Sequence, residues 1–463
     1  MAKHVGDVVV LLPGITGSVL RKGGKDVWAP TAGAVLGALL SLGDDIRQLK
    51  LGDDPLDEDE IDDVTAPSLI PDIHLIPGLW KIDGYGRIKK WITTNFDVRE
   101  GLNYFDFPYD WRRDNRVHAR SLARLGADWL KAYREDPQGN PDAKLVLVGH
   151  SMGGLISRYF LECLDGWRDT RMLVTFGTPY RGSVNAIDSL ANGMHKGVGP
   201  ISFDLSELVR SMNSVYQLLP IYPCVDGGDG TLVRPAEIGD IPHVDQARAQ
   251  AALEFHHEIS DAVEQHEQDD DYAQNRYEIR PVVGTFQPTN QSALLEGGKV
   301  KLLHTREGKD EDGDGTVPRV SATPIEVKRE ANAMFAGQRH ASLQDDDAVL
   351  IQLDGLLTGL GLDTSAIRAL PSINLSVDLE DAYAAGEPVH VRARPEADVF
   401  DPIVAVVEDD AGGEVAQGRL LLQDDGWYGT ELAPLPPGVY RVTVSSENVK
   451  PVTDVFGVFP TDG

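Results

Sequence analysis

The chain has 463 residues, 41% of them hydrophobic, with 73 acidic against 43 basic residues and a formal net charge of -30. This length predicts roughly two to four domains with a sizeable apolar core. The acidic balance excludes nucleic acid as a partner, because phosphate binding needs basic surface. It also argues against electrostatic recruitment to anionic lipid, so we expect at most peripheral membrane contact. Solubility or adaptation to salt accounts for such a charge more simply than a ligand site does.

Two cysteines, Cys163 and Cys224, do not make a disulfide framework, and we expect both to be free thiols in a reducing compartment. The apolar stretch Val8–Leu12 is short and runs into a Pro-Gly pair, so we expect no signal peptide. The longest candidate for a membrane span, Ala32–Gly43, falls short of the roughly 18 apolar residues required. Together these features predict a cytoplasmic protein.

Continuous apolar runs that end at turn residues predict buried strands, and helical periodicity separates them. Buried strands that alternate with helices predict an α/β fold, with a mostly parallel sheet covered by helices on both faces. The predicted strands are Val8–Leu12, Leu145–Val148, Arg171–Phe176 and Tyr277–Val283, and the predicted helices are Gly84–Thr94, Val117–Tyr133 and Gly154–Leu164.

Residues 183–272 break this alternation, since they are helical, polar and rich in loops, and we expect them to form an inserted helical cap over a cleft. Within the cap, an apolar stripe at helical spacing includes Leu208 and Met212. The stripe either packs the cap onto the core or lines an acyl tunnel, with Leu208 and Met212 as substrate-binding residues. The run Gly52–Asp63 carries eight acidic residues, and we expect a solvated loop there.

Beyond about residue 370, short segments rich in β-branched residues are separated by turn residues, which predicts an immunoglobulin-like β-sandwich. We therefore divide the chain into a catalytic domain, residues 1–368, and an all-β domain, residues 369–463. The predicted strands lie in the segments "INLSVDL", "PVHVRARP", "IVAVVED", "GRLLLQ" and "YRVTVSS".

The strongest motif is Gly-His-Ser-Met-Gly at residues 149–153, which follows a predicted buried strand and precedes a predicted helix. This is the context of a nucleophile elbow, in which the serine occupies a strained turn and its neighbours must be small. Ser151 would then lie at a helix N-terminus, where an oxyanion is favoured. A glycine-rich structural turn is the alternative interpretation.

A nucleophilic serine needs a histidine base, and in this fold the chain order is serine, acid, histidine. Of the twelve histidines, only His340 and His390 follow an acid near Asp314. His390 lies in an alternating strand pattern of the predicted sandwich, whereas His340 precedes an amphipathic helix. We therefore predict His340 as the base. We expect His150 to pack or orient its surroundings.

The acid comes from "DEDGDGTVPRV", where Asp314 lies between two glycines and Asp312 is the second choice. The run Asp310, Asp312, Asp314 and Gly315 also resembles the start of a calcium loop. That pattern fails further on, because Ser321 stands where a bidentate glutamate is required. We predict Asp314 as the acid and no metal site; His256 and His257 also lack metal-ligand spacing.

Two backbone amides should form the oxyanion hole. One belongs to the residue after the nucleophile, Met152. The other should lie in "LLPGITGS" after the first strand, where Gly14 and Gly17 allow close approach and either Ile15 or Thr16 presents an amide.

With these segments placed, the chain resembles the lecithin:cholesterol acyltransferase and lysosomal phospholipase A2 family of α/β-hydrolases. The resemblance rests on "VVLLPGITGSVL", "VWAP", "YFDFPYDWRRDN", "LVLVGHSMGGLISRYFL", "TFGTPYRGS" and "DGDGTVPRVSA", spread in order over residues 8–345. It implies an α/β-hydrolase fold, triad roles for Ser151, Asp314 and His340, and oxyanion roles for Ile15 and Met152. It does not cover the β-sandwich.

These observations predict a serine esterase of the lipase or phospholipase type, or an acyltransferase, that acts on acyl esters or lipids without a cofactor. An amidase, peptidase or thioesterase could use the same triad, because triad geometry does not name the leaving group. A catalytically silent binding protein is a further alternative, with the β-sandwich recognising a protein or carbohydrate partner.

Overall fold

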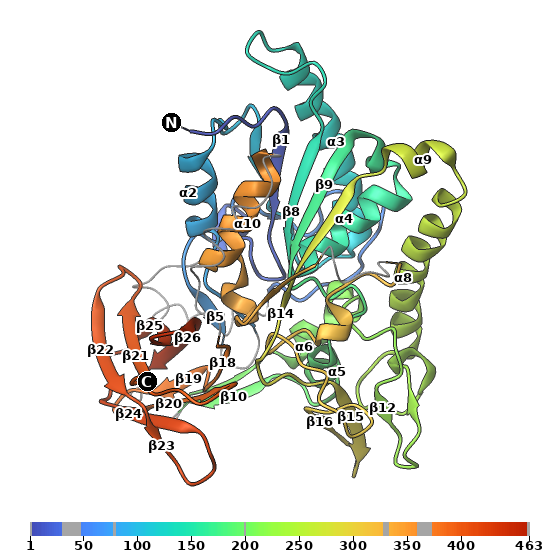
Figure 1. The fold of residues 1–463 in the computed structure, drawn as a ribbon. Helices are drawn as coiled ribbons and strands as arrows, with labels where there is room; N and C mark the ends of the chain where they lie inside the picture. Colours follow the sequence, from blue (N-terminus) through green and yellow to red (C-terminus); the bar gives the residue numbers. More distant parts are fainter. Residues whose placement is uncertain are drawn as a thin grey trace.

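The computed structural model describes residues 2–29, 48–76, 80–198, 201–326, 333–358 and 373–460. The stretch Ala32–Gly43 and the predicted domain boundary at residue 368 lie outside these ranges. At the centre is a six-stranded sheet in which every neighbouring pair of strands is parallel (Figure 1). Its order is β17 (Met334–Ala336), β14 (Glu278–Gly284), β9 (Thr170–Phe176), β8 (Leu145–His150), β1 (Val8–Leu12) and β7 (Tyr104–Asp106).

The four predicted sheet strands are confirmed, and their ends differ from prediction by at most two residues. Continuous apolar runs form these strands because both faces of the sheet are covered. In β1, Val8 and Val10 contribute to one apolar cluster, whereas Val9 and Leu11 contribute to another on the opposite face. The edge strands β7 and β17 were not predicted, because three residues carry too little periodicity.

Helices cover both faces, as predicted for an α/β-hydrolase fold (Figure 1). One face packs against α2 (Gly86–Asn95) and α10 (Asp347–Thr358) through one apolar cluster. The other face packs against α3 (Asn115–Glu135) and α4 (Met152–Cys163) through a second cluster.

Register brings the loops of the site to one edge of the sheet. Leu12 pairs with Gly149, and His150 pairs with Phe176, so the loops after β1, β8 and β9 leave the sheet side by side. The loops after β14 and β17 leave at the same edge, since all six strands are parallel. The carboxyl edge of such a sheet is where α/β proteins bind ligands.

The cap is mixed rather than helical, and it is built from two segments of the chain. Strand β12 (Val225–Asp226) pairs with the hairpin of β15 (Ser292–Glu296) and β16 (Lys299–Leu303), which lies beyond β14 and beyond the predicted end of the cap. The hairpin was missed because its strands are half-exposed and lack a continuous apolar run. The first segment comprises α5 (Val184–Ala191), β10 (His195–Val198), β11 (Ile201–Asp204), α6 (Ser206–Ser211), α7 (Asn213–Tyr216), β12 (Val225–Asp226), β13 (Leu232–Val233), α8 (Gln246–His266) and α9 (Asp270–Asn275), and the second comprises β15 (Ser292–Glu296) and β16 (Lys299–Leu303).

Between β1 and α2 the chain forms short strands: β2 (Leu20–Lys22), β3 (Lys25–Trp28), β4 (Val64–Thr65), β5 (His74–Ile76) and β6 (Trp80–Ile82). Within the described ranges, 3-10 helix occurs at Gly166–Asp169, Pro235–Glu237, Arg319–Ser321 and His340–Asp345. Among the described residues, no helix is both long and apolar enough to cross a bilayer.

The C-terminal region is all-β, as predicted, and consists of two sheets whose inward side chains share one apolar core. Its immunoglobulin-like character stays a prediction. One sheet contains β18 (Leu375–Leu379), β20 (Val389–Pro395), β24 (Tyr428–Leu432) and β23 (Leu421–Leu422); the other contains β19 (Ala382–Ala384), β26 (Val449–Phe459), β25 (Gly438–Ser446), β21 (Val404–Asp409) and β22 (Glu414–Arg419).

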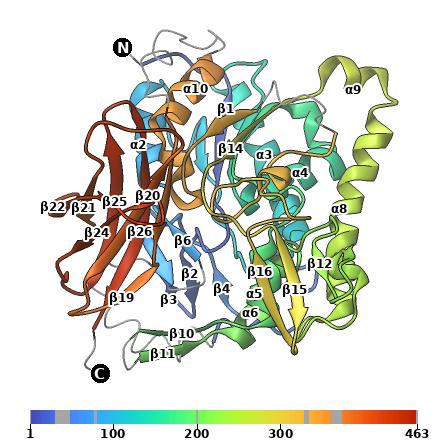
Figure 2. The ribbon, with the colours of Figure 1, turned by 60° about the horizontal axis from the view of Figure 1, so that its bottom comes forward.

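This all-β domain packs directly on the α/β domain (Figure 2). Side chains of both domains form a small buried cluster of Ile73, Ala341, Val439 and Val455. The side-chain amide of Gln287, after β14, donates a hydrogen bond to the carbonyl of Leu375 at 2.9 Å. The interface therefore lies beside the loops that leave the carboxyl edge of the central sheet.

Candidate active site

Ser151 occupies a left-handed backbone conformation between β8 and α4, with φ of 50° and ψ of -120°. Such a conformation costs a non-glycine residue about 1–3 kcal/mol and persists only where the surroundings impose it. Here the Ser151 amide donates to the carbonyl of Phe176 at 2.8 Å, which fixes the turn to β9. The hydroxyl is thereby presented at the N-terminus of α4, as the motif predicts.

The turn requires glycine at positions that a side chain would block. A Cβ atom on Gly153 would lie 2.5 Å from the carbonyl oxygen of Pro13, and one on Gly14 would lie 2.9 Å from Cβ of Ser151. The serine turn and the loop after β1 are thus in close contact.

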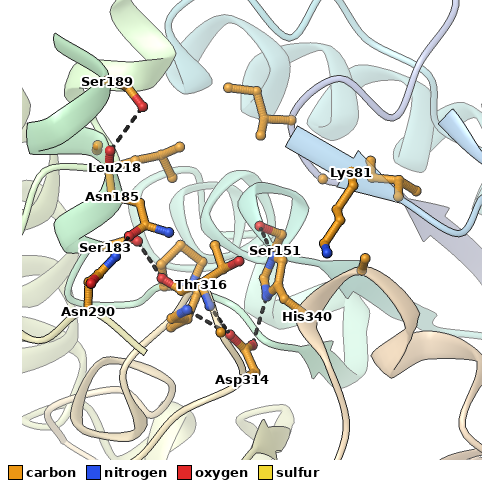
Figure 3. A pocket seen from close by; sticks show the side chains of 18 of the residues that line it. Lys81, Ser151, Ser183, Asn185, Ser189, Leu218, Asn290, Asp314, Thr316 and His340 are labelled. Carbon is orange, nitrogen blue, oxygen red and sulfur yellow. Dashed lines mark hydrogen bonds and ion pairs between the residues drawn. The ribbon is translucent and has the colours of Figure 1, made fainter. Parts of the chain in front are cut away.

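The three predicted triad residues lie together (Figure 3). Nε2 of His340 is 3.0 Å from Oγ of Ser151, and Nδ1 of His340 is 2.7 Å from Oδ2 of Asp314. With Nδ1–H donating to Asp314, Nε2 is free to accept the hydroxyl proton of Ser151, which is the tautomer that a general base needs.

Asp314 is held in one orientation. Its side chain is 1% exposed, and Oδ1 accepts hydrogen bonds from the amides of Thr316 at 2.9 Å and Val317 at 2.7 Å. Its carbonyl oxygen also accepts from the amide of His340 at 2.9 Å. Acid and base are therefore joined through both backbone and side chain.

Asp312, the second choice for the acid, points elsewhere. Its Oδ1 accepts from the amides of Phe286 and Gly313, and burial raises the pKa of its carboxyl above the usual range. Asp310 accepts from the side-chain amide of Gln291 at 2.6 Å. These carboxylates stabilise the loop instead of converging on a cation, and the described ranges contain no cluster of three or more His, Cys, Asp or Glu that could hold a metal.

His390 lies exposed on β20 in the all-β domain, away from Ser151. His256 is buried in α8, where Nε2 is 2.8 Å from the carbonyl of Gln217. Neither residue lines the cavity beside Ser151.

Gly177, at the end of β9, is a position whose role sequence analysis missed. It has φ of 54°, and a Cβ atom there would lie 2.7 Å from Nδ1 of His340 and 2.8 Å from Oδ2 of Asp314. Any side chain would therefore enter the His–Asp contact. The motif "TFGTP" marks this glycine, but only the structure gives the reason.

The predicted oxyanion residues flank the serine: Ile15 lines the pocket beside Ser151, and Met152 is the first residue of α4. The loop that carries Ile15 is held at both ends. The hydroxyl of Tyr109 donates to the carbonyl of Pro13 at 2.8 Å, and the indole of Trp28 donates to the carbonyl of Thr16 at 3.0 Å.

The motif "PYDWRRDN", at residues 108–115, supplies further contacts that hold the loop after β1. Besides Tyr109, its Trp111 donates to the carbonyl of Ser18 at 3.1 Å and packs edge-on against Trp28. The guanidinium groups of Arg112 and Arg113 are buried and pair with Asp62 at 3.0 Å and Asp54 at 2.8 Å respectively. The acidic run at residues 52–63 was expected to be a solvated loop, but these two carboxylates neutralise buried arginines.

A chain of hydrogen bonds joins the loop after β1 to His340. The amide of Gly14 donates to the hydroxyl oxygen of Tyr85 at 2.7 Å, and this hydroxyl lies 2.8 Å from Nδ1 of His150. Nε2 of His150 lies 3.1 Å from the carbonyl oxygen of His340. Because that carbonyl can only accept, His150 donates through Nε2 and accepts from Tyr85 through Nδ1. Burial, with the charge of His340, lowers the pKa of His150 to about 3, so the ring stays neutral and the chain keeps one direction.

The site opens into a cavity of about 420 Å³. Figure 3 shows Lys81 on the side of the cavity opposite to Asn185 and Ser189. The lining of the cavity is mixed, with apolar side chains from the cap and charged side chains from the domain interface. The lining includes Ile15, Ile82, Ala186, Val215, Leu218, Leu302, Val317, Lys81, Asn185, Asp188, Asn290, Arg339 and Asp381.

Leu208 and Met212, predicted to bind substrate, do not lie among the residues that line this cavity. They are 3% and 0% exposed and belong to the apolar core of the cap. The other interpretation of the stripe, packing, therefore describes their positions. Val215 and Leu218 of the same segment do reach the cavity.

Replacement of Tyr85 by phenylalanine tests the hydrogen-bond chain. We expect Tyr85→Phe to slow the reaction of Ser151 with a fluorophosphonate by about 10- to 100-fold, because a buried amide and a buried imidazole each lose a partner. Tyr104→Phe is the control, since that hydroxyl bonds Asp106 outside the site. Equal labelling rates for wild type and Tyr85→Phe would contradict a role for the chain.

Comparison with known proteins shows what this chain is similar to. The family model described as lecithin:cholesterol acyltransferase matches residues 80–279. Human lysosomal phospholipase A and acyltransferase is 33% identical over 122 residues, which cover 24% of this chain and 27% of the relative. Chicken (Gallus gallus) phosphatidylcholine-sterol acyltransferase is 32% identical over 94 residues, 20% of this chain and 22% of the relative. The chain thus spans about a quarter of the length of these curated relatives.

The relatives overturn one expectation. The prediction of a cytoplasmic protein is wrong, because relatives that include lysosomal enzymes point away from that compartment. The two cysteines are indeed free thiols, Cys163 half-buried and Cys224 buried. A low cysteine count limits disulfides, but a chain that folds without disulfides can do so in any compartment.

The family match covers the nucleophile elbow and the "PYDWRRDN" motif, whereas Asp314 and His340 lie beyond its last residue. The family model and these relatives therefore support the similarity to the lecithin:cholesterol acyltransferase family that the motifs indicate.

Proposed function

We propose that this protein transfers the acyl group of a lipid ester to Ser151 and then to water or another alcohol, as a phospholipase-type hydrolase or acyltransferase. The observation that carries the proposal is the unbroken chain from Ser151 through His340 to Asp314, with contacts of 3.0 Å and 2.7 Å. Serine, base and orienting acid in this arrangement are what acyl transfer through a covalent intermediate requires.

In the proposed reaction, Oγ of Ser151 forms a bond to the ester carbonyl carbon while its proton moves to Nε2 of His340. The carboxylate of Asp314 stabilises the imidazolium, and the amides of Ile15 and Met152 face the oxyanion. Collapse of the tetrahedral intermediate breaks the carbon–oxygen bond of the ester, and the leaving alkoxide takes the proton from His340. Water or an alcohol then repeats these steps on the acyl-enzyme and restores the serine.

Two observations support a lipid as the acyl donor. The relatives carry names of phospholipid and sterol acyltransferases. The cavity beside Ser151, about 420 Å³ in volume, presents an apolar wall with Val215, Leu218 and Leu302. A cavity of this size and mixed lining suits an acyl chain whose polar end stays near the charged side.

Ser151→Ala is the direct test of the nucleophile. We expect hydrolysis of phospholipid and simple acyl esters to fall by at least about 1,000-fold, with loss of fluorophosphonate labelling and an unchanged fold by circular dichroism. Parallel assays of amides and thioesters identify the leaving group that the enzyme accepts. Retention of more than a tenth of wild-type ester hydrolysis would refute the assignment.

The two aspartates of the acid loop should differ. We expect Asp314→Asn to lower kcat by about 1,000- to 10,000-fold, because asparagine favours the wrong tautomer of His340 and removes the charge that stabilises imidazolium. Asp312→Asn should stay within about tenfold of wild type, since an amide oxygen can still accept from the Phe286 and Gly313 amides. Steady-state kinetics of both variants decides the matter, and similar losses would reopen the choice of acid.

The cavity wall should set acyl-chain preference. Leu218→Ala widens the cavity, and we expect the ratio of kcat/KM for long over short acyl esters to rise by about tenfold. Leu208→Ala removes the same atoms from the core behind the cavity, so it should lower the thermal midpoint without changing the ratio. If Leu208→Ala changed the ratio and Leu218→Ala did not, the acyl site would lie elsewhere.

A further inference from the structure

The segment that carries the base, residues 338–341, is bound by the all-β domain. The amide of Thr453, on β26, donates to Oε1 of Gln338 at 2.9 Å. Nε of Arg339 donates to Oδ2 of Asp454 at 2.9 Å. Ala341 packs against Val455. Three consecutive residues of β26 therefore contact the residues on both sides of His340.

Asp454 is the centre of this contact. Its side chain is fully buried, and it accepts hydrogen bonds from Nζ of Lys81 at 2.8 Å and from the amide of Val455 at 2.9 Å, in addition to Arg339. Burial alone would raise the pKa of the Asp454 carboxyl, but the cations of Lys81 and Arg339 hold it below the usual range. The carboxylate is therefore charged at neutral pH and compensates two cations inside the interface.

Arg339 connects Asp454 to the acid loop. A Cβ atom on Gly315 would lie 2.7 Å from Nη1 of Arg339, so the guanidinium group rests against the backbone next to Asp314. Lys81 and Arg339 both line the cavity, and so does Asp381 of the all-β domain, which pairs with Lys81 at 2.9 Å. The interface is thus continuous with the wall of the site.

We propose that Asp454 is a positioning residue that holds His340 in place through Arg339, which makes the all-β domain a structural part of the active site. The inference rests on the proposed function for the identity of the base. On this proposal the two predicted domains share one active site, because a chain cut after the α/β domain would lose the carboxylate that holds Lys81 and Arg339.

The test is a double-mutant cycle on the full chain with Asp454→Asn, Arg339→Met and the double variant. We expect each single variant to lower kcat by about 10- to 100-fold, since small displacements of a base have effects of this size. Asp454 does not line the cavity, so Asp454→Asn should leave KM within about twofold on every ester. The double variant should be no worse than the single variants, because both remove one contact. Asp425→Asn, which breaks an exposed pair with Arg392 in the same domain, should behave as wild type.

The rate of fluorophosphonate labelling of Ser151 is measured alongside, because it reports on the base without knowledge of the substrate. A wild type that labels but cleaves no ester would contradict the proposed function, whereas slower labelling of Asp454→Asn would still support the positioning role. The positioning role would be overturned if Asp454→Asn labelled at the wild-type rate, or if the losses of the two single variants added in the double variant. If Asp454→Asn did not fold, Arg339→Met would decide, since it keeps the Asp454–Lys81 pair: the inference requires its labelling to be slow with a thermal midpoint near that of wild type.

Discussion

The left-handed turn at Ser151 is the constraint on which the rest of the site depends. The turn is stable only if β8, β9 and the loop after β1 hold it from three directions, since its φ of 50° is unfavourable for serine. The bond from the Ser151 amide to Phe176 and the approach of Pro13 to Gly153 supply that support. The same contacts set the loop after β1 beside the hydroxyl, so the strain at Ser151 and the position of the proposed oxyanion hole are two consequences of one packing arrangement.

Three sets of contacts, made by residues distant in sequence, support the site. Beneath the oxyanion loop, Tyr109 and Trp111 hold the backbone by hydrogen bonds from their side chains. Behind the elbow, neutral His150 links Tyr85 to the carbonyl of His340. On the outer side, β26 binds the residues that flank His340. Each set of contacts satisfies buried polar groups near the site. A buried polar group left unpaired there would lower the stability of the fold by more than one hydrogen bond contributes.

Sequence analysis could predict what depends on local pattern. The buried strands and the elbow were accessible because continuous apolar runs and glycine spacing are local signals. Chain order, together with an acid near Asp314, reduced the twelve histidines to two. The choice of Asp314 over Asp312 followed from its flanking glycines. In contrast, Tyr85 and Asp454 lie in no motif. The contact of Tyr85 with His150 spans 65 positions of the chain, and the contact of Asp454 with Arg339 spans 115. The pairing of the hairpin β15–β16 with the cap could not be predicted for the same reason, since pairing between distant short strands leaves no periodic signature.

Some of the many acidic residues have a structural role near the candidate site. The net charge of -30 suggested only a solvated surface, and many carboxylates do lie on it. Asp54, Asp62 and Asp454, however, face buried or half-buried cations, so part of the negative charge neutralises arginine and lysine around the site. A buried cation without such a partner would have to lose its proton or unfold its surroundings, and arginine cannot lose its proton in a protein. Arg112 also pairs with Asp110 of the motif "PYDWRRDN" at 2.6 Å, so the motif and the acidic run at residues 52–63 together neutralise the two arginines near the loop after β1. The candidate site therefore depends in part on residues that composition alone would assign to solvent.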